Sequence, residues 1–132
     1  MKGKPPDPAQ LNLFPQRLED LVNPGHPLCR LSKRMPWDDI EKHLSDFYHH
    51  GGRPAKPIRL MVSLLVLKQL YSLSDKSIVE RWVENPYYQF FSGETLFQWN
   101  IPCHPTDLVY FRKRIGKESV KKILKLSMEL HV

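Results

Sequence analysis

Apolar residues recur along this chain at spacings of three and four, in short segments separated by prolines and glycines. That spacing places them on one side of an α-helix. It predicts short helices over about residues 15–22, 36–48, 57–71, 74–84, 106–115 and 117–130, with a short aromatic turn of helix at 86–91. Strand-like alternation of convincing length is not visible in the sequence. We therefore expect an all-α fold of about six short helices.

The segment that follows Pro57 differs from the other predicted helices. Its middle, LMVSLLVL at residues 60–67, is apolar on nearly every side. A helix of that kind is buried by its neighbours, so we expect it at the centre of the fold. The apolar run is also too short to span a bilayer.

The helix ends carry their own signals. Pro36 with Asp38 and Asp39 is typical of a helix start, and Ser74 and Thr106 are candidate N-caps. Gly116 is expected to end one helix before the last one begins. Residues 23–35 are predicted to be a loop, and residues 92–105 a loop or at most a short hairpin.

Length and composition indicate one domain with an arm. The chain has 132 residues, of which 41% are hydrophobic. Residues 1–10 are polar and rich in proline, so we expect a flexible arm there and a helical domain over 11–132. Neither a secretory signal nor a transmembrane segment is expected, and the chain is predicted to be cytoplasmic and, in a bacterium, nucleoid-associated.

Positive charge is concentrated near the C-terminal end of the sequence. Residues 112–125 hold seven bases and one acid, which equals the net charge of +6 of the whole chain. The partner expected for such a stretch is a polyanion, above all nucleic acid. A Lys-rich helix that is merely solvated is the alternative explanation.

Catalytic and metal-binding patterns are not apparent. Cys29 and Cys103 form no CxxC pair. The adjacent His residues at 49–50 have no further Cys or His at the spacing that a four-ligand zinc site needs. The motifs of hydrolases, zinc proteases and P-loop enzymes are absent from the sequence. We expect no metal, no cofactor and no catalytic residue.

The predicted helix over 106–115 has the features of a recognition helix. Leu108, Phe111 and Ile115 form its inward stripe, and an exposed Tyr110 lies among bases on the other side. Arg114 is suited to a guanine edge, whereas lysines suit phosphates. The candidate DNA-binding residues are Thr106, Tyr110, Arg112, Lys113, Arg114, Lys117, Lys121, Lys122 and Lys125.

Three segments in a fixed order carry a family resemblance. They are RPAKPIRLMV from residue 53, LSDKSIVERWVENPYYQFFSG from residue 73 and PTDLVYFRKRIG from residue 105. The upstream NPGHPL and MPWDDIEKHL fit the same pattern. The chain, over about residues 11–130, resembles the N-terminal domain of bacterial insertion-sequence transposases of the InsH-like group.

The resemblance implies DNA binding during transposition. In that family a helical domain with a helix-turn-helix-like region, onto which residues 74–84 and 106–115 map, binds the terminal inverted repeats. A ribonuclease-H-like core with a DDE acid triad follows it. We expect double-stranded transposon ends as the partner and no cleavage activity, because this sequence stops before such a core and is either a truncated frame or a fragment.

A second hypothesis is an interaction module. The chain would pair with itself or with full-length transposase, and as a truncated copy would inhibit it. The aromatic run at 87–91 with Phe97 and Trp99 would supply the apolar patch, unless these side chains fill the core of the domain itself.

Overall fold

A computed structural model describes residues 15–48 and 56–131 of the chain. The predicted arm at residues 1–10 and the glycine pair at 51–52 lie outside these ranges. The described residues form helices and no paired strands, so the all-α prediction is confirmed. The helices are α2 (Leu18–Leu21), α3 (Pro27–Arg34), α4 (Trp37–Ser45), α5 (Ile58–Leu70), α6 (Asp75–Trp82), α7 (Pro86–Phe91) and α8 (Pro105–Leu130).

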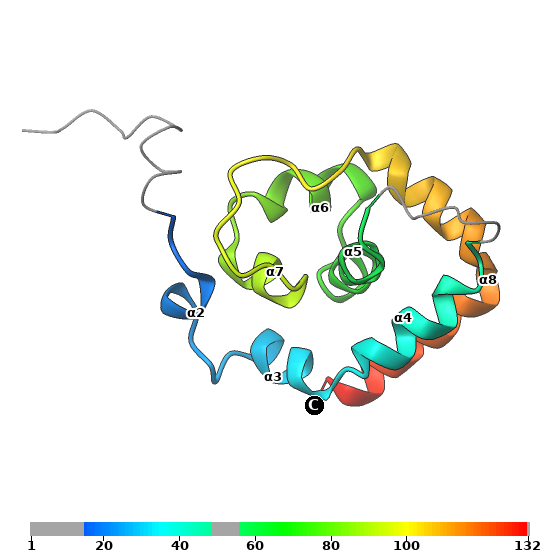
Figure 1. The fold of residues 1–132 in the computed structure, drawn as a ribbon, viewed down its shortest axis with the longest axis horizontal. Coiled ribbons are helices and arrows are strands. Elements are labelled where there is room, and N and C mark those ends of the chain that lie inside the picture. The colour runs from blue at the N-terminus through cyan, green and yellow to red at the C-terminus, as the bar shows by residue number, and fades with distance from the viewer. Residues whose placement is uncertain (1–14, 49–55, 132) are drawn as a thin grey trace, which may run out of the picture.

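Helix α5 is the centre of the fold. Every residue from Leu60 to Leu67 is buried, as its uniformly apolar sequence predicts. Figure 1 shows α5 end-on with the other helices arranged around it. Helices α4, α6 and α8 each pack directly against α5, whereas α2 and α3 reach the fold mainly through α7. A helix without a polar side must be enclosed in this way.

Helix α3 occupies the segment that was predicted to be a loop, and that prediction is wrong. His26 precedes the helix and its Nδ1 accepts a hydrogen bond from the Leu28 N–H at 3.0 Å, while Pro27 fits the first helical position. Leu28 and Leu31 are buried on the inward side. The helix was missed because histidine is not among the usual N-cap residues.

The N-cap of helix α8 lies two residues earlier than predicted. This residue is His104, whose N–H donates to the Asp107 carboxylate at 2.9 Å, and Pro105 is the first helical residue. Thr106 therefore lies inside the first turn and is not the cap. Pro105 accounts for the shift, because its fixed φ suits the first helical position.

Gly116 interrupts α8 without ending it. Its φ of 84° and ψ of 161° are not helical, and helical residues continue on both sides. Two helical halves, residues 105–115 and 117–130, therefore meet at this glycine. The prediction that Gly116 separates two helices is correct for the backbone conformation, and the two halves form one bent element that curves around α5 (Figure 1).

Residues 92–104 are irregular, in agreement with the predicted loop. They are held against the N-terminal segment by two backbone hydrogen bonds, from the Leu18 N–H to Thr95 O at 2.9 Å and from the Phe97 N–H to Gln16 O at 2.8 Å. The buried Gln89 amide donates to Gln98 O at 3.0 Å and accepts from the Gln98 N–H. The loop is thereby fixed across α2 and α7.

Replacing Gly116 with alanine is expected to destabilise the fold. A side chain has free space there, but the backbone conformation is one that essentially only glycine adopts, at a cost of about 1 to 3 kcal/mol for another residue. Urea unfolding of Gly116→Ala should show that loss. Gly25→Ala, at a glycine without positive φ, should change the unfolding free energy much less; equal effects would contradict this account of the bend.

Candidate nucleic-acid interface

The basic residues of α8 face three different directions. Among the candidate DNA-binding residues, all but Arg112 are exposed, and Arg112 is half-buried. Because the inward stripe is fixed by Leu108, Phe111, Ile115 and Ile123, which are buried, the exposed residues divide between the sides of the helix that remain.

Four lysines form a row along the outer side of α8. Lys117, Lys121 and Lys125 follow one another at four-residue spacing, which keeps side chains on one face of a helix. Lys113 lies across the bend and joins them by lining the same hollow as Lys117 and Lys121. That hollow, of about 630 Å³, lies at the bend, and Lys121 and Lys125 line a second hollow of about 540 Å³ farther along. We call these four residues the lysine row.

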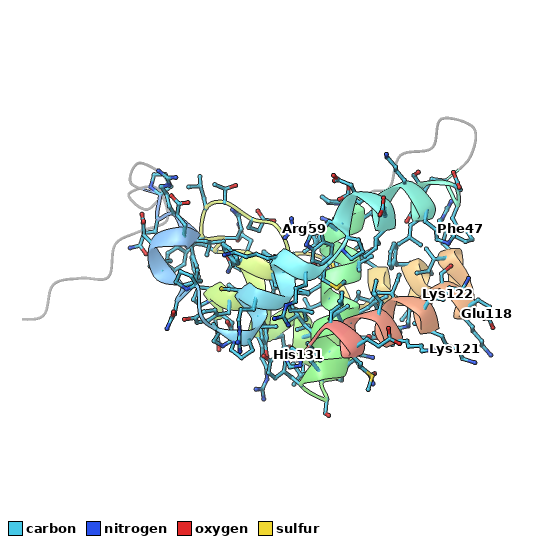
Figure 2. The ribbon with its side chains drawn as sticks, turned by 90° about the horizontal axis from the view of Figure 1, so that it is seen from below. Phe47, Arg59, Glu118, Lys121, Lys122 and His131 are labelled. Atoms are coloured by element: carbon cyan, nitrogen blue, oxygen red, sulfur yellow. The ribbon has the colours of Figure 1, made fainter. Side chains whose placement is uncertain are left out.

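Arg114 and Lys122 lie on the side of α8 that faces α4. The Arg114 Nη1 donates to Phe47 O at 3.3 Å, and its guanidinium lies 4.8 Å from the centre of the Tyr48 ring. Lys122 lines a hollow between α4 and α8 together with Asp39. Figure 2 shows Lys122 on the same side of α8 as Phe47, and Lys121 on the other side.

Arg112 points inward and holds a carboxylate. Its Nη1 and Nη2 donate to the two oxygens of Asp75 at 2.8 and 2.7 Å, and the Lys68 Nζ lies 3.1 Å from the same carboxylate. The hydrogen bonds from Arg112 are the main cause that lowers the pKa of Asp75 from 3.8 to about 2. This bidentate pair joins the start of α6 to the first half of α8. Arg112 is therefore a positioning residue in this structure, not a free phosphate ligand.

Tyr110 and Thr106 complete the candidate surface. The Tyr110 side chain is 67% exposed, so it does not serve the core, and Thr106 is exposed in the first turn of α8. An exposed tyrosine one turn from Lys113 offers both an aromatic face and a hydroxyl to a ligand. These residues lie on the first half of the helix, before the bend.

The two helices that the resemblance maps onto a helix-turn-helix-like region do touch. Helix α6 packs on α8, and the Asp75–Arg112 pair lies at their contact. They are not joined by a short turn, since α7 and residues 92–104 lie between them. Helices α5 and α6, by contrast, are joined by residues 71–74 alone, with Ser74 capping α6 as predicted.

A second group of exposed bases was not predicted. Arg30, Lys33 and Arg34 lie on the exposed side of α3, and the Arg34 Nη1 donates to Leu130 O at the end of α8 at 3.0 Å. The expectation of a loop over residues 23–35 hid these bases. Pro27 followed by Leu28 and Leu31 was the signal that would have revealed the helix.

None of the four aromatic side chains at residues 87–91 is exposed. Tyr88 and Phe91 are buried, and the Phe97 ring packs edge-on against Trp99 at 4.7 Å between centres. Trp99 and Ile101 are each 49% exposed. Among these aromatic residues and their neighbours, the apolar surface that stays exposed is therefore in the loop after α7.

Within residues 15–48 and 56–131, no group of three or more His, Cys, Asp or Glu side chains could hold a metal ion. Cys29 and Cys103 are buried free thiols, and burial raises the pKa of Cys103 to about 11. Over the same residues, no helix has the length and apolar character needed to cross a membrane.

Comparison with known proteins gives a family match. A family model described as a transposase domain, DUF772, matches residues 16–114. The "Uncharacterized protein ORF8 in nfe locus" of Rhizobium meliloti is 42% identical over 129 residues, which cover 98% of this chain. Those residues span 62% of the length of that relative. No solved structure matches.

The Asp75–Arg112 pair is expected to make the free energy of unfolding depend on pH in the acid range. A pKa lowered from 3.8 to about 2 corresponds to about 2 kcal/mol of stability. Because the folded-state pKa is depressed, this stability is present above pH 4 and is lost as the pH falls from 3.8 through 2. At pH 7 the free energy of unfolding of Asp75→Asn should be about 2 kcal/mol lower than that of the parent. This difference should shrink towards pH 2.

Chemical unfolding from pH 7 to pH 2 measures this difference. The control is Glu84→Gln, an exposed acid just beyond the end of α6. If Asp75→Asn and the parent lost stability in parallel over that range, the carboxylate would not be held by Arg112 as described.

Proposed function

The chain belongs to the DUF772 transposase-domain family, and from this premise we propose that it binds double-stranded DNA at the terminal inverted repeats of an insertion sequence. The description of the family as a transposase domain supports a role in transposition. The observation that supports DNA binding is that the whole net charge of +6 comes from residues 112–125, whose lysines are exposed on one bent helix. Such a surface attracts phosphates and releases counterions on binding.

The two halves of α8 would have different tasks. Thr106, Tyr110, Lys113 and Arg114 on the first half would approach base edges in a major groove, and Arg114 would leave Tyr48 to do so. The lysines at 117, 121, 122 and 125 would contact phosphates of the flanking duplex. Arg112 would act through Asp75, by fixing the angle of the first half against α6.

The proposal is limited to binding. Two acids near the candidate surface already make structural contacts, since Asp75 is held by Arg112 and Lys68, and Asp107 accepts from the N–H of His104. We propose that the chain belongs to the InsH-like group, with α6 and α8 as its helix-turn-helix-like region. Cleavage would require a catalytic core supplied outside these residues, and no cofactor is proposed.

Self-association or pairing with a full-length transposase is the second candidate function. The partly exposed Trp99 and Ile101 are the residues that would carry it, since the aromatic side chains at 87–91 are buried or half-buried. A monomer in sedimentation at micromolar concentration would contradict this candidate, and it would leave DNA binding untouched.

DNA binding is tested by fluorescence anisotropy with a labelled duplex that carries the terminal repeat. With about five phosphate contacts, the logarithm of the affinity should fall against the logarithm of the salt concentration with a slope of roughly −4 to −5. Removing two ligands in Lys113→Ala/Arg114→Ala should weaken binding at least about tenfold. That variant should also lower the preference for the repeat over unrelated DNA.

The matched control is Arg30→Ala/Lys33→Ala on α3. It removes one exposed arginine and one exposed lysine, so the change in net charge is the same. Equal losses in the two double variants would mean that net charge alone drives binding. Absence of binding to the repeat at low salt would refute the proposed function.

A further inference from the structure

The outer side of α8 carries a groove beside the lysine row. A hollow of about 630 Å³ at the bend has Val109, Gly116 and Val120 in its wall. A hollow of about 270 Å³ between α8 and the end of α5 shares Val120, and one of about 540 Å³ near the end of α8 shares Lys121 and extends to Met128. Because each pair of hollows shares at least one lining residue, we describe them together as one groove from Val109 to Met128.

The groove has an apolar floor. Val120 and Leu124 are half-buried against the core, and Met128 is 59% exposed. Val120, Leu124 and Met128 follow one another at four-residue spacing, so they form a continuous apolar stripe on one side of the second half of α8. An exposed methionine at the end of such a stripe is typical of surfaces that bind apolar side chains of a partner.

The rim of the groove is strongly basic. The lysine row borders the apolar stripe along its length, and Glu129 is the acid among the described residues that line the three hollows. Lys68 and Arg112 also line the groove, but both already contact the Asp75 carboxylate. The charge that remains for a ligand is that of the four lysines.

An apolar stripe with lysines along one side favours one kind of ligand. Duplex DNA matches the lysines, but it has no apolar side chains to cover Leu124 and Met128. A second copy of this chain would bring its own lysine row against the first one. An acidic amphipathic helix supplies both components, with apolar residues for the stripe and carboxylates for the rim.

We propose that this groove binds an acidic amphipathic helix of a partner protein. Its apolar side packs on Val120, Leu124 and Met128, and its flanking glutamates or aspartates pair with the lysine row. The inference goes beyond DNA binding, and it adds a regulatory consequence. Because the same lysines are proposed to contact phosphates, the acidic helix and DNA exclude each other from α8.

The probe is a labelled synthetic peptide with a heptad repeat that has leucine at positions a and d and glutamate at e and g. Its control has the same composition with the leucines distributed evenly around the helix. We expect the amphipathic peptide to bind the full chain at least about tenfold more tightly than the control, because only it can bury leucines on the stripe. Unlabelled repeat DNA should displace it.

Two matched variants locate the contact. Met128→Gln removes an exposed apolar side chain from the groove and should weaken peptide binding about tenfold. Leu21→Gln removes one from α2, which lines none of the three hollows, and should change nothing. Equal binding of the two peptides, or an unchanged affinity in Met128→Gln, would overturn the inference, since the contact would then rest on charge alone.

The DNA measurement separates this inference from the proposed function. Met128→Gln should bind the repeat duplex like the parent, because Met128 offers nothing to phosphates. Peptide binding with the expected pattern and no repeat binding would refute the proposed function and support the groove. If the chain bound the repeat duplex but bound the two peptides equally, the groove proposal alone would be refuted.

Discussion

The burial of α5 is the constraint on which the rest of the structure depends. A helix with apolar residues on every side is stable in water only when other helices enclose it, and α4, α6 and α8 supply that enclosure. The inward side of α8 is thereby fixed by Leu108, Phe111 and Ile123. Once that side is fixed, the lysines between these residues must face outward. The basic surface is therefore a consequence of how the core is closed.

Two contacts then divide one basic segment into three parts with different roles. Arg112 is drawn inward by Asp75, Arg114 lies over Tyr48, and the lysine row remains exposed. The bend at Gly116 changes the direction of the row, so a straight helix would present the same charges differently. A charge count alone cannot distinguish these three roles, because they depend on which side of α8 meets which neighbour.

Sequence patterns predict the helices well where periodicity and the usual cap residues agree. Pro57, Ser74 and the apolar stretch at 60–67 are examples, and the structure confirms all three. Prediction fails for α3 and for the start of α8, since His26 and His104 take N-cap positions that histidine seldom occupies. It also misses the Asp75–Arg112 pair. That contact joins residues 37 positions apart, and only the packing of α6 on α8 brings them together.

Acetylation footprinting of the chain with and without repeat DNA tests the central claim, that the outer side of α8 is the DNA-binding surface. Each lysine reports separately, and all those compared here are exposed. The account predicts that DNA protects Lys113, Lys117, Lys121 and Lys125, and that Lys33, Lys42 and Lys76 react as before. Protection spread evenly over both groups, or confined to the second, would contradict it.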